Sequence, residues 1–223
     1  RSVMGLAAYG NYDSAIFEKV SSVFDIANEP IAFKTDPTFR YQNKRTFGKR
    51  FSDKFVELFG EPRRQEDSIM QEKFINLAFA FQSQLEKILL HQSKGIQTLT
   101  GENNAYYSGG VHMNCKANGV IRNSNIFSKT FFHPASSDNG VSLGAAILAK
   151  EDEEGYLLSD FKIKTDLYKG TFYSDQDVIK AIKKSKLKAY RCNNPSSLGA
   201  YALFKNLIVG WFQGQMEIGA RAL

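Results

Sequence analysis

The strongest periodic pattern in the chain is an apolar stripe in its middle third. Apolar residues recur there at steps of three and four positions, which places them along one side of an α-helix. Ser68 followed by Gln71 fits a capping box at the start, and Gly95 is expected to mark the end. The pattern predicts a long helix over residues 68–92. The stripe consists of Phe74, Leu77, Ala78, Phe81, Leu85, Ile88 and Leu89.

Shorter helical patterns precede this segment. Residues 14–23 predict one helix, and the apolar spacing of residues 51–59 predicts another that ends at Gly60, with Pro62 beyond it. Between them the chain is rich in Lys, Arg, Thr and aromatic residues without a clear period. Its basic stretch Lys44–Arg50 is read as a solvated face.

Two short aromatic segments, residues 105–108 and 130–133, predict strands. The first runs into a glycine-bearing turn and then a helix over residues 115–122. The second is broken by Pro134 and leads through a small polar loop into a helix that starts near residue 140. Strand, turn and helix repeated in this order indicate an α/β fold.

The last third of the chain carries weaker signals. Ser174 with Asp177 fits the cap of a basic helix, and Ser196 or Ser197 is expected to cap another. The apolar run from Leu207 to Phe212 predicts a buried strand.

Composition narrows the class of protein. The 223 residues are 43% hydrophobic and 23% charged, which excludes a disordered chain. The apolar runs are far shorter than the ~20 residues of a membrane helix, and a net charge of +6 is weak evidence for a nucleic-acid partner. Two cysteines form neither a disulfide framework nor a zinc site, so we expect a reduced, cytoplasmic protein. Cys115 and Cys192 are expected to be small buried residues.

The first candidate site is the turn after the first strand. Gly109 and Gly110 would let a ligand approach the backbone because no Cβ blocks it. The helix start that follows suits phosphate, and Asn114 offers both a donor and an acceptor. The alternative is a simple tight turn, which the two glycines taken alone favour.

The second candidate is Asp138, in the turn after the second strand. A carboxylate at a strand-to-helix turn could ligate a cation that bridges nucleotide phosphates. The alternative, which residue chemistry alone favours, is that Asp138 caps the helix that follows. Both turns come at the carboxyl ends of strands, where open α/β sheets bind ligands. We therefore expect them to face one crevice.

A third candidate is the loop of residues 211–221, in which Arg221 suits phosphate or carboxylate. Its alternative is a surface hairpin. His91, His112 and His133 lack metal-ligand spacing and are read as structural or solvated, with His133 the exception to watch because it precedes the Asp138 turn. No catalytic residue, and no general base in particular, is identifiable from the sequence.

Five separated stretches, taken in order, resemble the O-carbamoyltransferase family of nodulation and antibiotic-tailoring enzymes. Ala8 replaces a usual Pro in the first, and Gln215 and Ala220 replace Arg and Pro in the last. The stretches are V-M-G-L-A-A-Y-G from Val3, F-G-E-P-R-R from Phe59, G-G-V-H-M-N-C-K-A-N-G from Gly109, P-A-S-S-D-N-G-V-S-L-G-A-A from Pro134, and G-W-F-Q-G-Q-M-E-I-G-A-R-A-L from Gly210.

This resemblance implies a fold and a reaction. The fold is the back half of a sugar-kinase/Hsp70/actin-like (ribonuclease H-like) domain over residues 1–187, followed by the start of a YrdC-like α/β domain over residues 188–223. The reaction uses ATP and carbamoyl phosphate to form carbamoyl adenylate. The carbamoyl group then passes to a hydroxyl of a small sugar or antibiotic-like acceptor. A homodimer is compatible with this reading, whereas a membrane or nucleic-acid partner is not expected.

The resemblance also assigns residues. Gly109, Gly110, Asn114 and Gly140 match the nucleotide-contacting turns. Asp138 matches a metal ligand, with iron or magnesium as the metal. Arg221 falls in the carbamoyl and phosphate-binding segment. With the resemblance added, the ligand interpretation of the two turns outweighs the structural one.

Some features depart from the family pattern. Its His-x-x-x-His metal motif does not occur in this sequence, and Gln215 removes a positive charge. We therefore expect an internal piece of a longer protein, inactive when isolated. Two other interpretations stay open. One is a kinase or a tRNA threonylcarbamoyltransferase-like protein of the same superfamily, and the other is a non-catalytic nucleotide-binding module.

Overall fold

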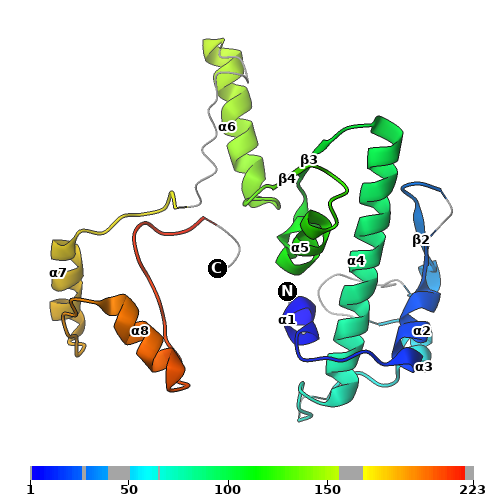
Figure 1. The fold of residues 1–223 in the computed structure, drawn as a ribbon, viewed down its shortest axis with the longest axis horizontal. Helices are drawn as coiled ribbons and strands as arrows, with labels where there is room; N and C mark the ends of the chain where they lie inside the picture. The colour runs from blue at the N-terminus through cyan, green and yellow to red at the C-terminus, as the bar shows by residue number, and fades with distance from the viewer. Residues whose placement is uncertain (1, 27–28, 40–50, 65, 156–167, 219–223) are drawn as a thin grey trace. The chain divides into compact units, whose positions relative to one another are not determined.

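The structure is a computed structural model that describes residues 2–26, 29–39, 51–64, 66–155 and 168–218 (Figure 1). The chain divides into two compact units, residues 1–138 and 139–223. The first unit contains α1 (Ser2–Ala7), α2 (Ser14–Val23), β1 (Phe24–Ile26), β2 (Phe33–Thr35), η1 (Pro37–Phe39), α3 (Asp53–Phe59), α4 (Glu72–Thr100), β3 (Asn104–Tyr107), η2 (Gly110–Met113), α5 (Cys115–Asn123) and β4 (Lys129–Phe132). The second contains α6 (Asn139–Glu154), α7 (Asp175–Ser185) and α8 (Pro195–Phe204).

The long helix α4 organises the first unit. Helices α1, α2 and α5 pack against it, and Figure 1 shows α4 between α1 and α5 on one side and α2 on the other. Apolar side chains from α2, α3 and α4 form one core cluster, because burying them removes apolar area from water. The buried members are Val20, Val23, Phe59 and Ala80, with Phe55, Leu77 and Phe81 among the partly buried residues around them.

The predicted helix exists, but its ends differ from the prediction. Ser68 does not cap it: the N-cap is Gln71, and Ser68 Oγ accepts from the Met70 N–H at 3.1 Å. Gly95 does not end it either. A Cβ at Gly95 would lie 1.6 Å from the Pro30 carbonyl oxygen, so this glycine permits a close approach within the helix. The helix ends at Gly101, which adopts φ 69°.

The apolar stripe also gives an incomplete account of what α4 buries. Three of its polar residues are buried and bonded to other segments. Asn76 accepts from the Asn11 N–H at 2.8 Å, Gln82 pairs with Asn114, and Ser93 Oγ lies 2.9 Å from the Tyr107 hydroxyl. A buried polar group needs such a partner, and hydrophobic periodicity does not reveal one.

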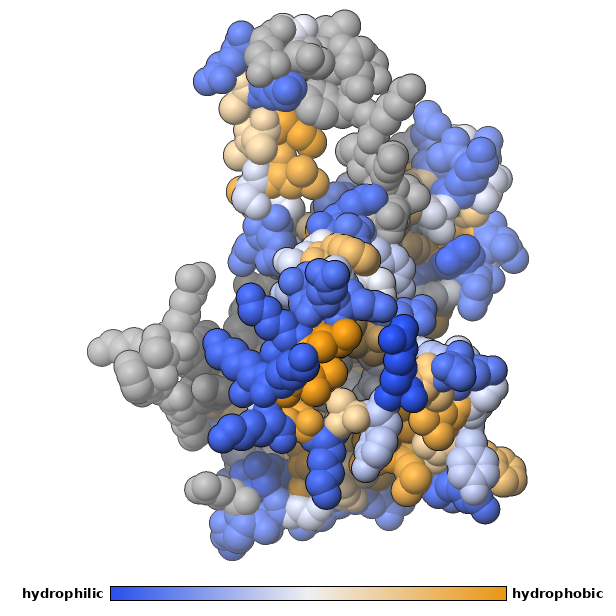
Figure 2. Space-filling model, turned by 90° about the vertical axis from the view of Figure 1, so that its left-hand side faces the viewer, coloured by the Kyte–Doolittle hydropathy of each residue, from blue (hydrophilic) through white to orange (hydrophobic). Residues whose placement is uncertain are grey.

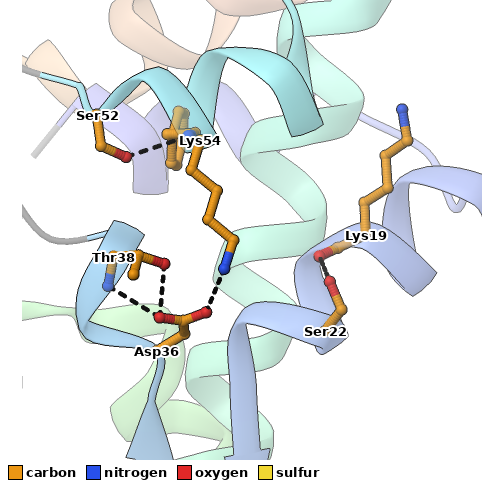
Figure 3. A network of polar contacts seen from close by, with 7 residues as sticks. Lys19, Ser22, Asp36, Thr38, Ser52 and Lys54 are labelled. Carbon is orange, nitrogen blue, oxygen red and sulfur yellow. Dashed lines mark hydrogen bonds and ion pairs between the residues drawn. The ribbon is translucent and has the colours of Figure 1, made fainter.

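The antiparallel pair β1–β2 leads into a polar network around Asp36 (Figure 3). Lys54 Nζ donates to Asp36 Oδ2 at 2.6 Å, and Thr38 donates to Oδ1 through its N–H at 2.9 Å and its hydroxyl at 2.6 Å. The hydrogen bond from Lys54, followed by those from Thr38, lowers the pKa of Asp36 to about 2. This network ties the end of β2 to the start of α3.

The pair β3–β4 is parallel, and Asn104 to Tyr107 align with Lys129 to Phe132. Each strand is followed by a turn and a helix, α5 and α6, as the sequence predicts. This confirms the local α/β pattern. Parallel strands joined by a helix need a crossover connection, and η2 with α5 supplies it. The actin-like fold stays a prediction, as does a domain boundary after residue 187.

In the second unit, the capping box of α7 joins Ser174 and Asp177 as predicted. The cap of α8 is different: Asn194 is the N-cap and Pro195 the first helical residue, in place of Ser196 or Ser197. Pro at that position needs no amide partner, and the Asn carboxamide accepts from the Ser197 N–H.

The strand predicted at residues 207–212 does not form. Ile208 is fully exposed and Phe212 is 66% exposed, because no strand of the described residues pairs with this segment. Figure 2 shows apolar side chains at the surface beside hydrophilic ones. The prediction of buried cysteines is also wrong, since both Cys115 and Cys192 are exposed. Cys115 is the first residue of α5, where its Sγ contacts Met4 Sδ at 3.9 Å.

Candidate functional site

The two candidate turns leave the same edge of the β3–β4 sheet. Tyr107 and Phe132, the last residues of the two strands, are register partners, and the His133 N–H donates to the Tyr107 carbonyl at 3.1 Å. A Cβ placed on Gly110 would lie 3.6 Å from Ser137 Oγ. The glycine turn and the 133–138 turn are therefore in contact at the carboxyl ends of parallel strands.

Gly109 and Gly110 differ in what they contribute. Gly109 has φ 103°, a conformation that residues with a Cβ rarely adopt, and an added Cβ there meets no atom within 4 Å. Its backbone conformation, rather than crowding, calls for glycine. Gly110 begins η2, and its added Cβ would make an ordinary contact. Both glycines are exposed, so a ligand can approach the backbone here.

Asn114 holds the turn in place through contacts inside the protein. Its Oδ1 accepts from the Ala117 N–H at 3.0 Å and caps α5, and its carboxamide also pairs with that of Gln82 on α4. Gln82 is 3% exposed. Asn114 therefore fixes where α5 starts relative to α4, and the predicted nucleotide contact remains a prediction.

Asp138 is exposed and ends the first unit. Gly140 is the second residue of α6, in the other unit, and Arg221 lies outside the described residues, as does Lys44–Arg50. Among the residues that the structure describes, no three His, Cys, Asp or Glu side chains gather as a metal site. One carboxylate does not fill a coordination sphere, so a metal at Asp138 would need further ligands.

His112, which the sequence analysis reads as structural or solvated, is held beside the glycine turn. It lies in η2, two residues after Gly110, and its half-buried ring packs against Tyr107 and Phe132 with centroids 4.9 and 5.9 Å away. Its Nδ1 lies 3.1 Å from Asn118 Oδ1, and Asn118 Nδ2 donates to the His112 carbonyl at 2.8 Å. The available signal was a histidine followed by an amide six residues later, across the start of a helix.

The other histidines have backbone partners. His133 Nδ1 accepts from the Ala135 N–H at 3.1 Å and so stabilises the turn that leads to Asp138. His91 Nε2 lies 3.0 Å from the Glu29 carbonyl oxygen. The structural interpretation fits both contacts, and His133 supports the turn that leads to Asp138.

Neutral aromatic groups surround the strand ends. Burial raises the pKa of Tyr107, partly opposed by the hydrogen bond with Ser93, and burial also raises the pKa of Tyr106. Both phenols are therefore uncharged near neutral pH. The two strands thus place uncharged rings next to the turns.

A groove of about 1140 Å³ opens along the same two strands. Its lining combines two stacked rings, Tyr106 and Phe131, with amides and two cations. The lining residues are Asn104, Ala105, Tyr106, Arg122, Asn123, Asn125, Phe127, Ser128, Lys129, Thr130 and Phe131. Such a surface combines apolar contact with hydrogen-bonding groups.

Comparison with known proteins identifies the class to which these turns belong. Residues 1–147, which include the glycine turn and the Asp138 turn, match the family described as Carbamoyltransferase N-terminus. Since this match covers more than half of the chain, the chain belongs to the carbamoyltransferase family.

Individual relatives agree with this assignment. An uncharacterized protein of Synechocystis is 30% identical over 99% of this chain and 36% of its own length. Nodulation protein NolNO of Sinorhizobium fredii is 30% identical over 66% of this chain and 22% of its own length. The 3'-hydroxymethylcephem-O-carbamoyltransferase of Streptomyces clavuligerus is 30% identical over 53% of this chain and 21% of its own length. The chain thus spans about a third or less of the length of these relatives.

No described helix of this chain combines the length and apolar character needed to cross a bilayer.

Proposed function

We propose that the protein carrying this chain transfers a carbamoyl group to a hydroxyl of a small sugar or antibiotic-like molecule. The observation that carries the proposal is the family match over residues 1–147, because it includes both turns at the carboxyl ends of β3 and β4. The cephem relative supports an oxygen acceptor, since its name specifies O-carbamoyl transfer.

The carbamoyl donor in this proposal is carbamoyl adenylate, made from carbamoyl phosphate and ATP. Carbamoyl adenylate is a mixed anhydride, so AMP is a good leaving group when an alcohol attacks the carbamoyl carbon. The site then has to orient the acceptor, remove its proton and stabilise charge that develops on the phosphate. The exposed glycine turn suits phosphate because its backbone is accessible and its conformation is fixed.

Each remaining residue has a defined task in this scheme. Asn114 positions α5 and so shapes the turn in front of the phosphate. Asp138 would contribute one carboxylate to a metal ion, which when bound would neutralise phosphate charge. Arg221 would contact the carbamoyl or phosphate group, and the actin-like and YrdC-like domains would each carry one half-reaction.

The test is an assay of the full-length gene product with ATP, carbamoyl phosphate and a panel of sugars and hydroxymethyl compounds. We expect AMP formation together with an O-carbamoyl product. Asp138→Asn should lower transfer at least tenfold, whereas Asp152→Asn, another exposed carboxylate, should leave it unchanged. AMP formation equal in wild type and Asp138→Asn, with no carbamate product in either, would argue against the proposal.

A further inference from the structure

The hydrogen bonds of Asn118 determine which nitrogen of the His112 ring carries its proton. Asn118 faces the His112 carbonyl oxygen at 2.8 Å. A carbonyl only accepts, so the atom of Asn118 facing it must be the amide nitrogen. The carboxamide oxygen then faces His112 Nδ1 at 3.1 Å. That oxygen only accepts as well, so Nδ1 must carry a hydrogen and the neutral ring has a bare lone pair at Nε2.

The bare nitrogen is accessible to solvent. In the described residues, Nδ1 is the ring nitrogen of His112 that makes a hydrogen bond, and Nε2 has no protein partner there. Among the described residues that are not exposed, every side-chain nitrogen or oxygen that is itself buried has a hydrogen-bond partner. Since His112 is half-buried, Nε2 must be exposed to water or ligand.

The ring lies where the two candidate turns begin. It contacts Tyr107 and Phe132, the last residues of β3 and β4, and the His112 N–H donates to the carbonyl of Gly109 at 3.0 Å. From β3, β4 and α5, the Tyr107 ring, the Phe132 ring and the Asn118 carboxamide contact the His112 ring. None of them carries a charge near neutral pH that would compete for the proton.

We propose that His112 Nε2 is the general base that takes the proton from the acceptor hydroxyl. This inference rests on the proposed carbamoyl transfer. The acceptor oxygen bonds to the carbamoyl carbon, the bond from that carbon to the phosphate oxygen breaks, and AMP leaves with the electron pair. The hydroxyl proton passes to Nε2, and the imidazolium then releases it to water.

Asn118 is a positioning residue in this arrangement. It holds the Nδ1–H tautomer and the ring orientation through two hydrogen bonds to one residue. An aspartate in its place would still accept from Nδ1 but would lose the bond to the His112 carbonyl. Asn118→Asp should therefore shift the acid side of the pH profile of kcat upward, because a carboxylate favours the protonated imidazolium. If Asn118 had only a structural role, Asn118→Asp would not shift the acid side of the pH profile of kcat.

The experiment compares His112→Gln with His91→Gln in the full-length gene product. His91 is the matched control, because its ring contacts the backbone carbonyl of Glu29. Two rates are measured: carbamoyl-phosphate-dependent release of pyrophosphate from ATP without acceptor, which reports formation of carbamoyl adenylate, and carbamoyl transfer to acceptor. We expect His112→Gln to slow transfer about 10²-fold or more, to leave acceptor-independent pyrophosphate release within twofold of wild type, and to remove the acid limb of the transfer pH profile.

Transfer by His112→Gln within twofold of wild type, with the acid limb intact, would overturn the base role while leaving the proposed function standing. A wild type that forms no carbamate would overturn both. Should His112→Gln fail to fold, modification of wild type by diethylpyrocarbonate replaces it. Loss of transfer must then track modification of His112 as read by peptide mass spectrometry, and a His112 that stays unmodified in the native protein overturns the inference.

Discussion

The side-chain amides of Gln82 and Asn114 form a reciprocal pair between α4 and α5. Nδ2 of Asn114 donates to Oε1 of Gln82 at 2.8 Å, and Nε2 of Gln82 donates to Oδ1 of Asn114 at 3.2 Å. The same Oδ1 caps α5. One pair of uncharged residues thus sets the position of the helix that follows the glycine turn.

Asn114→Ala should destabilise the first unit through this pair. The variant loses a helix cap, a cost of about 1 kcal/mol, and leaves the buried Gln82 amide short of partners, about 1–3 kcal/mol more. Urea unfolding followed by circular dichroism should show a loss of about 2–4 kcal/mol. Asn123→Ala, at the exposed end of α5, is the control and should change stability by less than about 0.5 kcal/mol. Equal effects of the two substitutions would contradict the role of the pair.

Gly95→Ala should be strongly destabilising although alanine is the better helix former. The added Cβ would lie 1.6 Å from the Pro30 carbonyl oxygen, so the backbone must move apart, at a cost of about 3 kcal/mol or more. Gly119→Ala in α5 is the matched control, because its Cβ meets nothing within 4 Å, and it should gain up to about 1 kcal/mol. Thermal unfolding of both variants measures the difference. A Gly95→Ala variant as stable as wild type would show that the Pro30 carbonyl does not lie this close to Gly95.

The Asp36 network should make stability depend on pH in the acid range. The pKa of the Asp36 carboxyl is lowered to about 2 in the folded protein, whereas it is about 3.9 in the unfolded chain. The folded state therefore gains stability above pH 4 that is lost as the pH falls from about 4 to 2. Wild type should be more stable than Asp36→Asn at pH 6, and the gap should close by pH 2.

The size of this gap should be modest, because Asp36 and Lys54 are both solvent-accessible and salt screens exposed pairs. Asp25→Asn, at an exposed carboxylate on β1, is measured beside it as the control for removing a surface charge. A gap for Asp36→Asn that persists unchanged at pH 2 would be inconsistent with the hydrogen bonds to its carboxylate.

Both cysteines should react with a thiol reagent in the native protein, since both are exposed. Titration with Ellman's reagent should give the same number of thiols with and without denaturant. Met4→Leu removes the sulfur that Cys115 contacts, and Cys115 should remain reactive in that variant. A thiol that reacts only after denaturation would show that its cysteine is buried in the native protein.

The sequence predicts the local elements well where a period or a cap is complete. The 14–23 helix, the helix that ends at Gly60 and the Ser174–Asp177 capping box are all confirmed. So are the two aromatic strands and the turns between them and their helices. Each of these depends on residues near one another in the chain, and short-range sterics and hydrogen bonds decide them.

The failures come from contacts between distant segments. Gly95 looks like a helix end until Pro30 is seen against it. The apolar run at Leu207 looks like a strand, but a strand needs a partner, and the described residues supply none. The role of His112 depends on the direction of two hydrogen bonds from Asn118, which spacing does not specify. The two turns are in contact because β3 and β4 are parallel and in register. The sequence pattern favours parallel strands but does not determine which residues pair.

The central claim, carbamoyl transfer at the paired turns, is tested most directly by mass spectrometry of the acceptor after incubation of the full-length gene product with ATP and isotopically labelled carbamoyl phosphate. Our account predicts an acceptor that carries the labelled carbamoyl group on oxygen, with AMP formed in equal amount, and at least tenfold less product in Asp138→Asn. An acceptor that is phosphorylated instead, or that stays unmodified while ATP is consumed, would contradict it.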